Sequence, residues 1–118
     1  PHPRSYAQAL PRKMRRLALR SALSSKVAED RLLVLDRLSM EAPRTKDMVE
    51  VLRALGVVGK TMIVLPAMDQ TVMKAARNLP EVLTVTPGTM NLLDILSRDR
   101  LVMTVDAVNA VTEWLGAK

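Results

Sequence analysis

Cationic side chains are concentrated in the first quarter of the 118-residue chain. Residues 1–31 hold eight of the eighteen lysines and arginines but only two of the twelve acidic residues. Residues 32–118 carry ten basic and ten acidic side chains, so the formal net charge of +6 belongs entirely to the first segment. Clustered cations neutralise phosphates and release counterions from a polyanion. The charge distribution therefore predicts a polyanionic partner, and the alternative is a solvated basic helix.

These cations fall on a segment with helical spacing, from Leu10 to Ala28. Its apolar residues form two stripes at i, i+3 and i+4 steps, Leu10-Met14-Leu17 and Leu19-Leu23-Val27. Both stripes are expected to hold the helix to a core. The cations group into two sectors, Lys13-Arg16-Arg20 and Arg12-Arg15-Lys26. Like charges on one helix repel each other, and a phosphate backbone would relieve that repulsion.

One segment has the residue types of a phosphate-binding loop. Residues 54–61, Ala-Leu-Gly-Val-Val-Gly-Lys-Thr, satisfy its relaxed pattern of a small residue, any four residues and then Gly-Lys-Thr. The mechanism requires the loop to follow a strand and open a helix, so that helix N-terminal amides face the phosphates. Here the pattern predicts a helix before the loop and a strand after it. We therefore expect no nucleotide site, with Gly56 ending the helix and Lys60 preceding the strand.

Other catalytic and metal-binding chemistry has few side chains to use. The chain has no cysteine, and its one histidine is His2. A histidine-based triad or metal cluster needs further partners, and none stands near His2 in sequence. Four acidic residues are expected near helix N-termini, where capping explains them: Asp47, Asp69, Asp94 and Asp106. The sequence therefore predicts a protein that is not an enzyme and that holds no metal and no cofactor.

Aromatic and membrane chemistry are equally restricted. Tyr6 and Trp114 are the only aromatic rings of the Phe, Trp and Tyr class, too few for a platform that stacks a run of single-stranded bases. The longest strongly apolar stretch, residues 61–68, is far shorter than the roughly 20 residues of a membrane helix. We expect no membrane partner.

Beyond residue 31, short apolar runs alternate with amphipathic segments. Strands are predicted at 32–35, 62–65, 82–85 and 101–104. Helices are predicted at 45–55, 70–79, 91–96 and 106–115, with Thr45, Asn91 and Asp106 as N-caps. Gly56, Pro80 and Gly116 are expected to end three of these helices.

This alternation is typical of a buried parallel sheet covered on both faces. We therefore predict an α/β fold, a three-layer αβα sandwich with a mostly parallel, Rossmann-like sheet, preceded by a basic helix. The expected organisation is one domain, with residues 1–31 as its basic arm and helix and residues 32–118 as its globular body.

Several blocks, in collinear order over nearly the whole chain, resemble the bacterial-type ribosomal large-subunit protein four family. They are Pro3-Arg4-Ser5-Tyr6, Leu10-Pro11-Arg12-Lys13, Arg15-Arg16-Leu17-Ala18-Leu19-Arg20-Ser21-Ala22-Leu23-Ser24, Pro43-Arg44-Thr45-Lys46, Ala75-Ala76-Arg77-Asn78-Leu79-Pro80, Asn91-Leu92-Leu93-Asp94-Ile95-Leu96 and Leu101-Val102-Met103-Thr104. The resemblance implies a structural constituent of the large ribosomal subunit that binds large-subunit ribosomal RNA and supports assembly. Implied partners are that RNA and neighbouring large-subunit proteins. The expected location is the cytoplasmic ribosome, with an organellar ribosome as the alternative.

The resemblance also selects the residues expected to contact RNA. They are Arg4, Arg12, Lys13, Arg15, Arg16, Arg20 and Lys26, followed in a second group by Arg44, Lys46, Arg77 and Asn78. Their expected role is to neutralise phosphates, which positions the domain without reading base sequence. For Arg77 the alternative is a cation at a helix end. The family's N-terminal segment and extended loop precede the residues that match Pro1, so the resemblance assigns no contact with the peptide exit tunnel to the residues of this sequence.

Two other function classes remain open on sequence grounds. A doubly wound fold also carries nucleotide-binding modules and enzymes, and fold alone does not fix function. A basic helix also docks acidic proteins in interaction domains.

Overall fold

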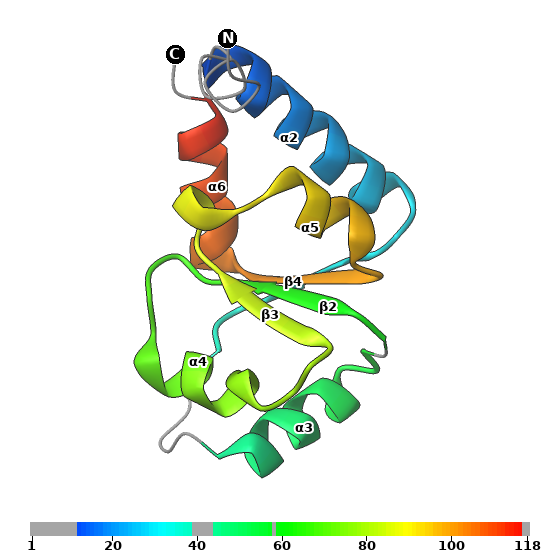
Figure 1. The fold of residues 1–118 in the computed structure, drawn as a ribbon, viewed down its shortest axis with the longest axis vertical. Coiled ribbons are helices and arrows are strands. Elements are labelled where there is room, and N and C mark those ends of the chain that lie inside the picture. Colours follow the sequence, from blue (N-terminus) through cyan, green and yellow to red (C-terminus); the bar gives the residue numbers. More distant parts are fainter. Residues whose placement is uncertain (1–11, 39–43, 58, 117–118) are drawn as a thin grey trace, which may run out of the picture.

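One parallel sheet lies at the centre of the molecule (Figure 1). The computed structural model describes residues 12–38, 44–57 and 59–116. Within them the strands are β1 (Leu32–Leu35), β2 (Thr61–Val64), β3 (Val82–Val85) and β4 (Arg100–Thr104), in the order β1-β4-β2-β3. All three pairings of this sheet are parallel, and Val102 of β4 lies opposite both Leu33 of β1 and Ile63 of β2.

Helices cover both faces of the sheet, so the predicted α/β sandwich of three layers is confirmed. One layer consists of α3 (Thr45–Ala54) and α4 (Gln70–Arg77). The other consists of α2 (Arg12–Ala28), α5 (Leu92–Ser97) and α6 (Val105–Gly116), with the short 3₁₀ helix η1 (Pro87–Thr89) beside them. The chain steps across the sheet from β1 through β2 to β3 and then returns to β4. Right-handed crossovers in opposite directions place their helices on opposite faces.

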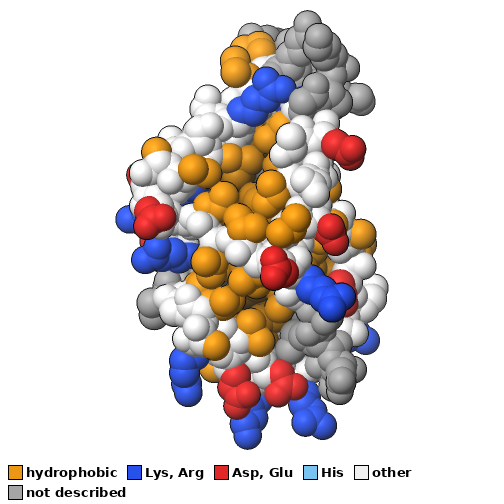
Figure 2. All heavy atoms as spheres, turned by 180° about the vertical axis from the view of Figure 1, so that it is seen from behind, with side chains coloured by type: hydrophobic (Ala, Val, Ile, Leu, Met, Phe, Trp, Pro, Cys, Tyr) orange, Lys and Arg blue, Asp and Glu red, His pale blue; other side chains and the backbone are white. Residues whose placement is uncertain are grey.

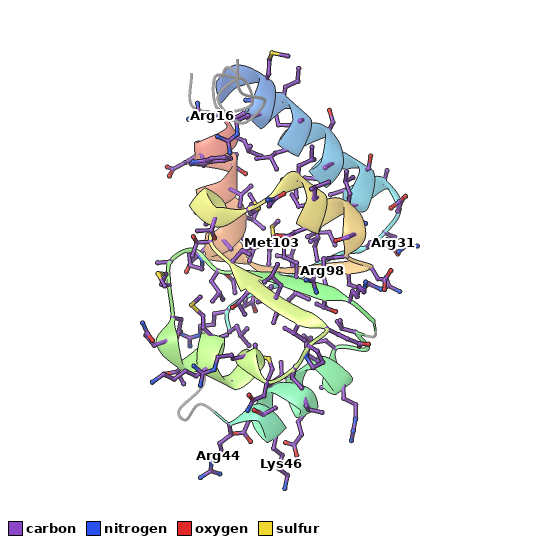
Figure 3. All side chains as sticks on the ribbon, viewed as in Figure 1. Arg16, Arg31, Arg44, Lys46, Arg98 and Met103 are labelled. Atoms are coloured by element: carbon purple, nitrogen blue, oxygen red, sulfur yellow. The ribbon has the colours of Figure 1, made fainter. Side chains whose placement is uncertain are left out.

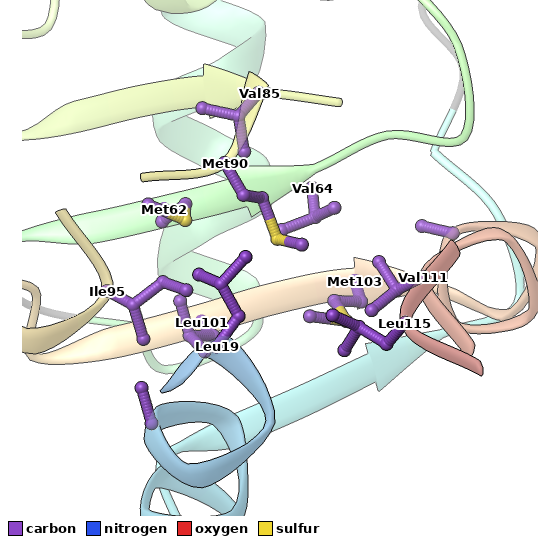
Figure 4. Packing of buried hydrophobic residues seen from close by; sticks show 12 residues of the cluster. Leu19, Met62, Val64, Val85, Met90, Ile95, Leu101, Met103, Val111 and Leu115 are labelled. Atoms are coloured by element: carbon purple, nitrogen blue, oxygen red, sulfur yellow. The ribbon is translucent and has the colours of Figure 1, made fainter. Parts of the chain in front are cut away.

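Alternate residues of the central strands feed two separate cores. Met62 and Leu101 point into the α2/α5/α6 layer, where Leu19 of α2 joins them (Figure 4). Ile63 and Val102 point into the α3/α4 layer. Strand side chains alternate between faces, so a strand that is apolar throughout must be buried on both sides. This alternation explains why β2 and most of β4 are fully buried.

Hydrogen bonds confirm one predicted N-cap and correct another. Asn91 caps α5 as expected, its Oδ1 accepting from the backbone N–H of Leu93 at 2.8 Å. Asp106, by contrast, lies inside α6, and the backbone N–H of Ala107 donates to Thr104 Oγ1 at 3.1 Å instead. The prediction for Asp106 was wrong because the helix follows β4 without a loop, which leaves the last strand residue to cap it.

Thr45 was also wrongly predicted as an N-cap. It is the first helical residue of α3, and the extended N-cap residue is Arg44, without a side-chain cap bond. The predicted ends are otherwise close: α4 stops at Arg77, two residues before the expected end, and Gly56 follows α3 with φ +71°. Helix α6 runs to Gly116.

Helix α2 packs through only part of one of its two expected apolar stripes, because Val27, at the end of the Leu19-Leu23-Val27 stripe, is 57% exposed. Leu19 is buried at 6% exposure, and Leu23 packs partly buried against the same core. Met14 and Leu17 are 57% and 61% exposed, so the prediction that their stripe packs on the core was wrong. The helix contacts α5 and α6 along one side, which leaves Met14 and Leu17 facing outward. Leu10, the predicted start of the helix, lies outside the described residues.

Candidate nucleic-acid interface

Helix α2 contacts the C-terminal ends of α5 and α6 through its cations. The Arg20 guanidinium donates a hydrogen bond to the Leu115 carbonyl in the last turn of α6. Lys26 Nζ donates to the carbonyl of Arg98, the C-cap of α5, at 2.7 Å. The last carbonyls of a helix lack intrahelical partners and carry partial negative charge. Neither α5 nor α6 has a basic residue in its own last turn, so α2 supplies the cation for both.

A third cation of α2 contacts the only tryptophan of the chain. The guanidinium carbon of Arg16 lies 5.4 Å from the centroid of the Trp114 ring, within the range of a cation–π contact. Both side chains are half-buried. Figure 3 shows Arg16 at the end of the molecule where α2 begins, close to α6. Arg16 therefore joins α2 to the last part of α6.

Arg15 differs from these three residues. It is exposed, and the structure gives its side chain no hydrogen bond, ion pair or ring contact among the described residues. Arg12 and Lys13 belong to α2, but their side chains lie outside the described part, as does the whole of Arg4. Of the α2 cations with described side chains, Arg15 is thus the one fully available to an external anion.

The second group of candidate residues lies in the other helical layer. Arg44 and Lys46 stand at the start of α3, exposed, at the opposite end of the molecule from Arg16 (Figure 3). Arg77 and Asn78 are exposed at the C-terminal end of α4, where Asn78 is the C-cap. The structure therefore does not bring the described members of the two groups together: they occupy opposite faces of the sheet.

Further arginines, which the sequence analysis did not select, meet at the amino ends of β1 and β4. Arg31 forms ion pairs with Glu29 at 3.7 Å and with Asp99 at 3.8 Å. Arg98 donates to the Glu81 carbonyl at 3.1 Å. Both side chains thus contact neighbouring loops, and within the described residues Arg98 Nε is buried without a hydrogen-bond partner. The available signal was their position in the sequence, because Arg31 stands directly before β1 and Arg98 two residues before β4.

The segment that resembles a phosphate-binding loop has the arrangement expected of a false match. It follows α3 and leads into β2, and the backbone N–H of Thr61 donates to the Glu81 carbonyl at 2.8 Å. The Lys60 N–H donates to Asp99 Oδ2 at 3.1 Å. A carboxylate therefore occupies the amide that a phosphate would need. This confirms the prediction that the loop does not open a helix.

The reverse side of the molecule carries a mixed set of charges. Figure 2 shows hydrophobic side chains along the middle of this face, with cations and acids scattered around them. Val34 of edge strand β1 is 48% exposed. Among the described helices, none has the length and apolar character needed to cross a bilayer.

Comparison with known proteins gives a family match over almost the full length. Residues 1–114 match the model of the ribosomal protein L4/L1 family. The large ribosomal subunit proteins uL4 of Oceanobacillus iheyensis and Carboxydothermus hydrogenoformans are each 50% identical to the chain, over 115 and 113 residues. These alignments cover 98% and 96% of the chain but only 56% and 55% of the two relatives. The chain thus spans a little over half the length of these relatives, and the resemblance expected from the sequence is confirmed.

Proposed function

The chain belongs to the ribosomal protein L4/L1 family, and from this premise we propose that it is a non-catalytic constituent of the large ribosomal subunit. It binds large-subunit ribosomal RNA and supports assembly of the subunit. Its further partners are neighbouring large-subunit proteins, and its place is the cytoplasmic ribosome. The organellar ribosome is the alternative location.

The observation that carries this proposal is the separation of charge along the chain. The entire net charge of +6 belongs to residues 1–31, whereas the α/β body is neutral. A cationic helix on a neutral body favours a polyanion, and folded RNA presents phosphates at a density that such a helix can neutralise. Arg15 supports the proposal most directly, because its exposed guanidinium has no intramolecular task among the described contacts.

Two groups of cations would then act on the RNA. The first lies on and before α2: Arg4, Arg12, Lys13, Arg15, Arg16, Arg20 and Lys26. The second lies in the α3/α4 layer: Arg44, Lys46 and Arg77, with Asn78 as a neutral donor. In the first group Lys26 is only 7% exposed and Arg20 bonds to Leu115, so these two act mainly by holding α2 in place. Phosphate contacts of the others position the domain, and the shape of the RNA supplies specificity.

A salt titration tests the proposal. The logarithm of the binding constant for large-subunit ribosomal RNA is expected to fall with the logarithm of salt concentration at a slope of roughly −3 to −5, if about five phosphates are neutralised. Filter binding over a series of salt concentrations measures this slope. A response that is flat in salt contradicts RNA binding through the basic segment.

A pair of matched variants locates the interface. Arg15→Ala is expected to weaken RNA binding and to make the salt slope shallower by about 1, as the loss of one phosphate contact should. Lys74→Ala removes an exposed lysine of α4, in the opposite layer. It is expected to leave the RNA affinity and the salt slope unchanged. Circular dichroism of both variants checks that the fold is retained. Equal effects of the two variants contradict an interface centred on α2.

A further inference from the structure

A hollow of about 200 Å³ lies between α2, η1 and α6. Its walls are Arg15 and Arg16 of α2, Gly88 and Met90 on or beside η1, and Trp114 of α6. A wider and shallower hollow adjoins it, shares Gly88 and Trp114, and extends to the loops that follow β2 and β3. Both hollows therefore lie toward the carboxyl ends of the parallel strands. That end of an open α/β sheet is where ligands bind in such folds.

The walls of the smaller hollow combine two chemistries. The half-buried indole of Trp114 offers a flat π surface, and the Arg16 guanidinium lies 5.4 Å from its centroid. Arg15, beside them, is an exposed cation with no described partner. Indole and guanidinium planes are the surfaces on which proteins stack unpaired bases, and arginine is the preferred partner of phosphate.

We propose that this hollow binds one unpaired nucleotide of RNA, with its base against the Trp114 indole and its phosphate against Arg15 and Arg16. The inference rests on the proposed RNA-binding function and names a recognition site within it. It adds base contact to an interface otherwise made of phosphate contacts, and so allows an RNA with an extruded base to be preferred over a regular duplex.

The surroundings restrict the site to a single nucleotide in one orientation. Trp114 is one of only two aromatic residues in the chain, so successive bases cannot be stacked on a series of rings. Glu113 lines the wider hollow, and its carboxylate disfavours a phosphate there. The phosphate therefore belongs on the arginine side. Gly88 leaves open space, because a Cβ built on it meets no atom within 4 Å.

Fluorescence of Trp114 reports directly on this site, since it is the only tryptophan. The 118-residue chain is titrated at low salt with an RNA hairpin that carries one unpaired adenosine, and with the same hairpin carrying an abasic residue there. The two RNAs have equal phosphate charge. We expect quenching of the tryptophan by the first RNA alone, and about tenfold weaker binding of the abasic RNA, as loss of one stacked base should give.

Variants separate base binding from the contact that joins α2 to α6. Trp114→Phe is expected to keep most of the preference for the adenosine hairpin, and Trp114→Leu to abolish it. Gly88→Leu fills the hollow without occupying a left-handed backbone position, whereas Gly88→Ala adds only a methyl group as its control. Gly88→Leu is expected to remove both quenching and preference, and Gly88→Ala to retain them.

The outcomes distinguish this inference from the proposed function. If both hairpins bind equally and in a salt-dependent manner, without quenching, the nucleotide site is overturned and RNA binding by the basic helix stands. If Gly88→Leu retains the full preference, the base lies elsewhere and the site is likewise overturned. If neither hairpin binds at low salt, the proposed function fails, and the site fails with it.

Discussion

Helices α2 and α4 cover opposite faces of one sheet and use their cations in opposite ways. In α4, Asp69 caps the first turn by accepting from the N–H groups of Thr71 and Val72 at 3.0 and 3.2 Å. The helix packs through apolar residues, while Lys74 stays exposed. In α2, Lys26 lies on the buried face beside Leu19, and its ammonium caps α5.

The number of cations on a basic helix therefore exceeds the number that is available to bind a ligand. A cation whose stem lies on the packing face is drawn to the nearest unpaired carbonyl, which here is the end of another helix. Lys26 and Arg20 both do this in α2. The cations that do not bond to these carbonyls, such as Arg15, are the ones that the proposed function assigns to RNA contact. Helix α4 packs through apolar side chains alone, so its exposed cations are expected to add little to the stability of the fold.

The largest effect is expected where the two layers share the sheet. Ile63→Ala, on the α3/α4 side, and Leu101→Ala, on the α2 side, should each lower the free energy of unfolding by about 2–5 kcal/mol. Both side chains are essentially fully buried, so truncation removes apolar contacts and leaves a cavity. Urea denaturation measures both variants. If Leu101→Ala alone lowered the free energy of unfolding by less than about 1 kcal/mol, the α2 layer would be loosely packed, and its cations could not be said to hold α2 on a tight core.

The apolar pattern predicted this sheet but not its order. Runs such as residues 62–65 are apolar on both faces, which requires helices on both sides and hence parallel strands. Nothing in the residues of β4 specifies that it inserts between β1 and β2. That placement depends on which strand pairs bury the most surface, a property of the whole fold. Similarly, the N-cap Asn91 was predictable because a loop precedes α5. Thr104 caps α6 only because that helix follows a strand directly.

The candidate site was predictable in composition but not in orientation. The sequence showed that α2 is basic, but it did not show that the stripe with Met14 and Leu17 is exposed. The burial of Lys26 was predictable, because it stands seven residues after Leu19 and four after Ala22, on the same helical face. The contact between Arg16 and Trp114 joins residues almost a hundred positions apart, and helical periodicity carries no information on such pairs.

An intermediate effect is expected from replacing the buried cation of α2. Lys26→Met keeps an unbranched apolar side chain but removes the ammonium that bonds to the Arg98 carbonyl at 2.7 Å. The free energy of unfolding should fall by about 1.5–3 kcal/mol, the range of hydrogen bonds to charged groups. Lys74→Met is the matched control on α4 and should stay within about 0.5 kcal/mol of the parent. Equal values for the two in thermal or urea denaturation would contradict the contrast between the helices.

The smallest effect is expected at Lys60, which belongs to neither helix and is the lysine of the segment that resembles a phosphate-binding loop. Lys60→Ala should change the free energy of unfolding by no more than about 0.5 kcal/mol, because the side chain is exposed and its described hydrogen bonds are made by backbone atoms. RNA affinity should also persist, since Lys60 lies at the amino end of β2 and is not among the cations proposed to contact RNA. A working phosphate loop needs convergent amides at a helix start, and here the Thr61 amide already pairs with Glu81. Calorimetric titration with Mg-ATP should therefore show no binding, and saturable micromolar binding that Lys60→Ala abolishes would reverse this interpretation of the loop.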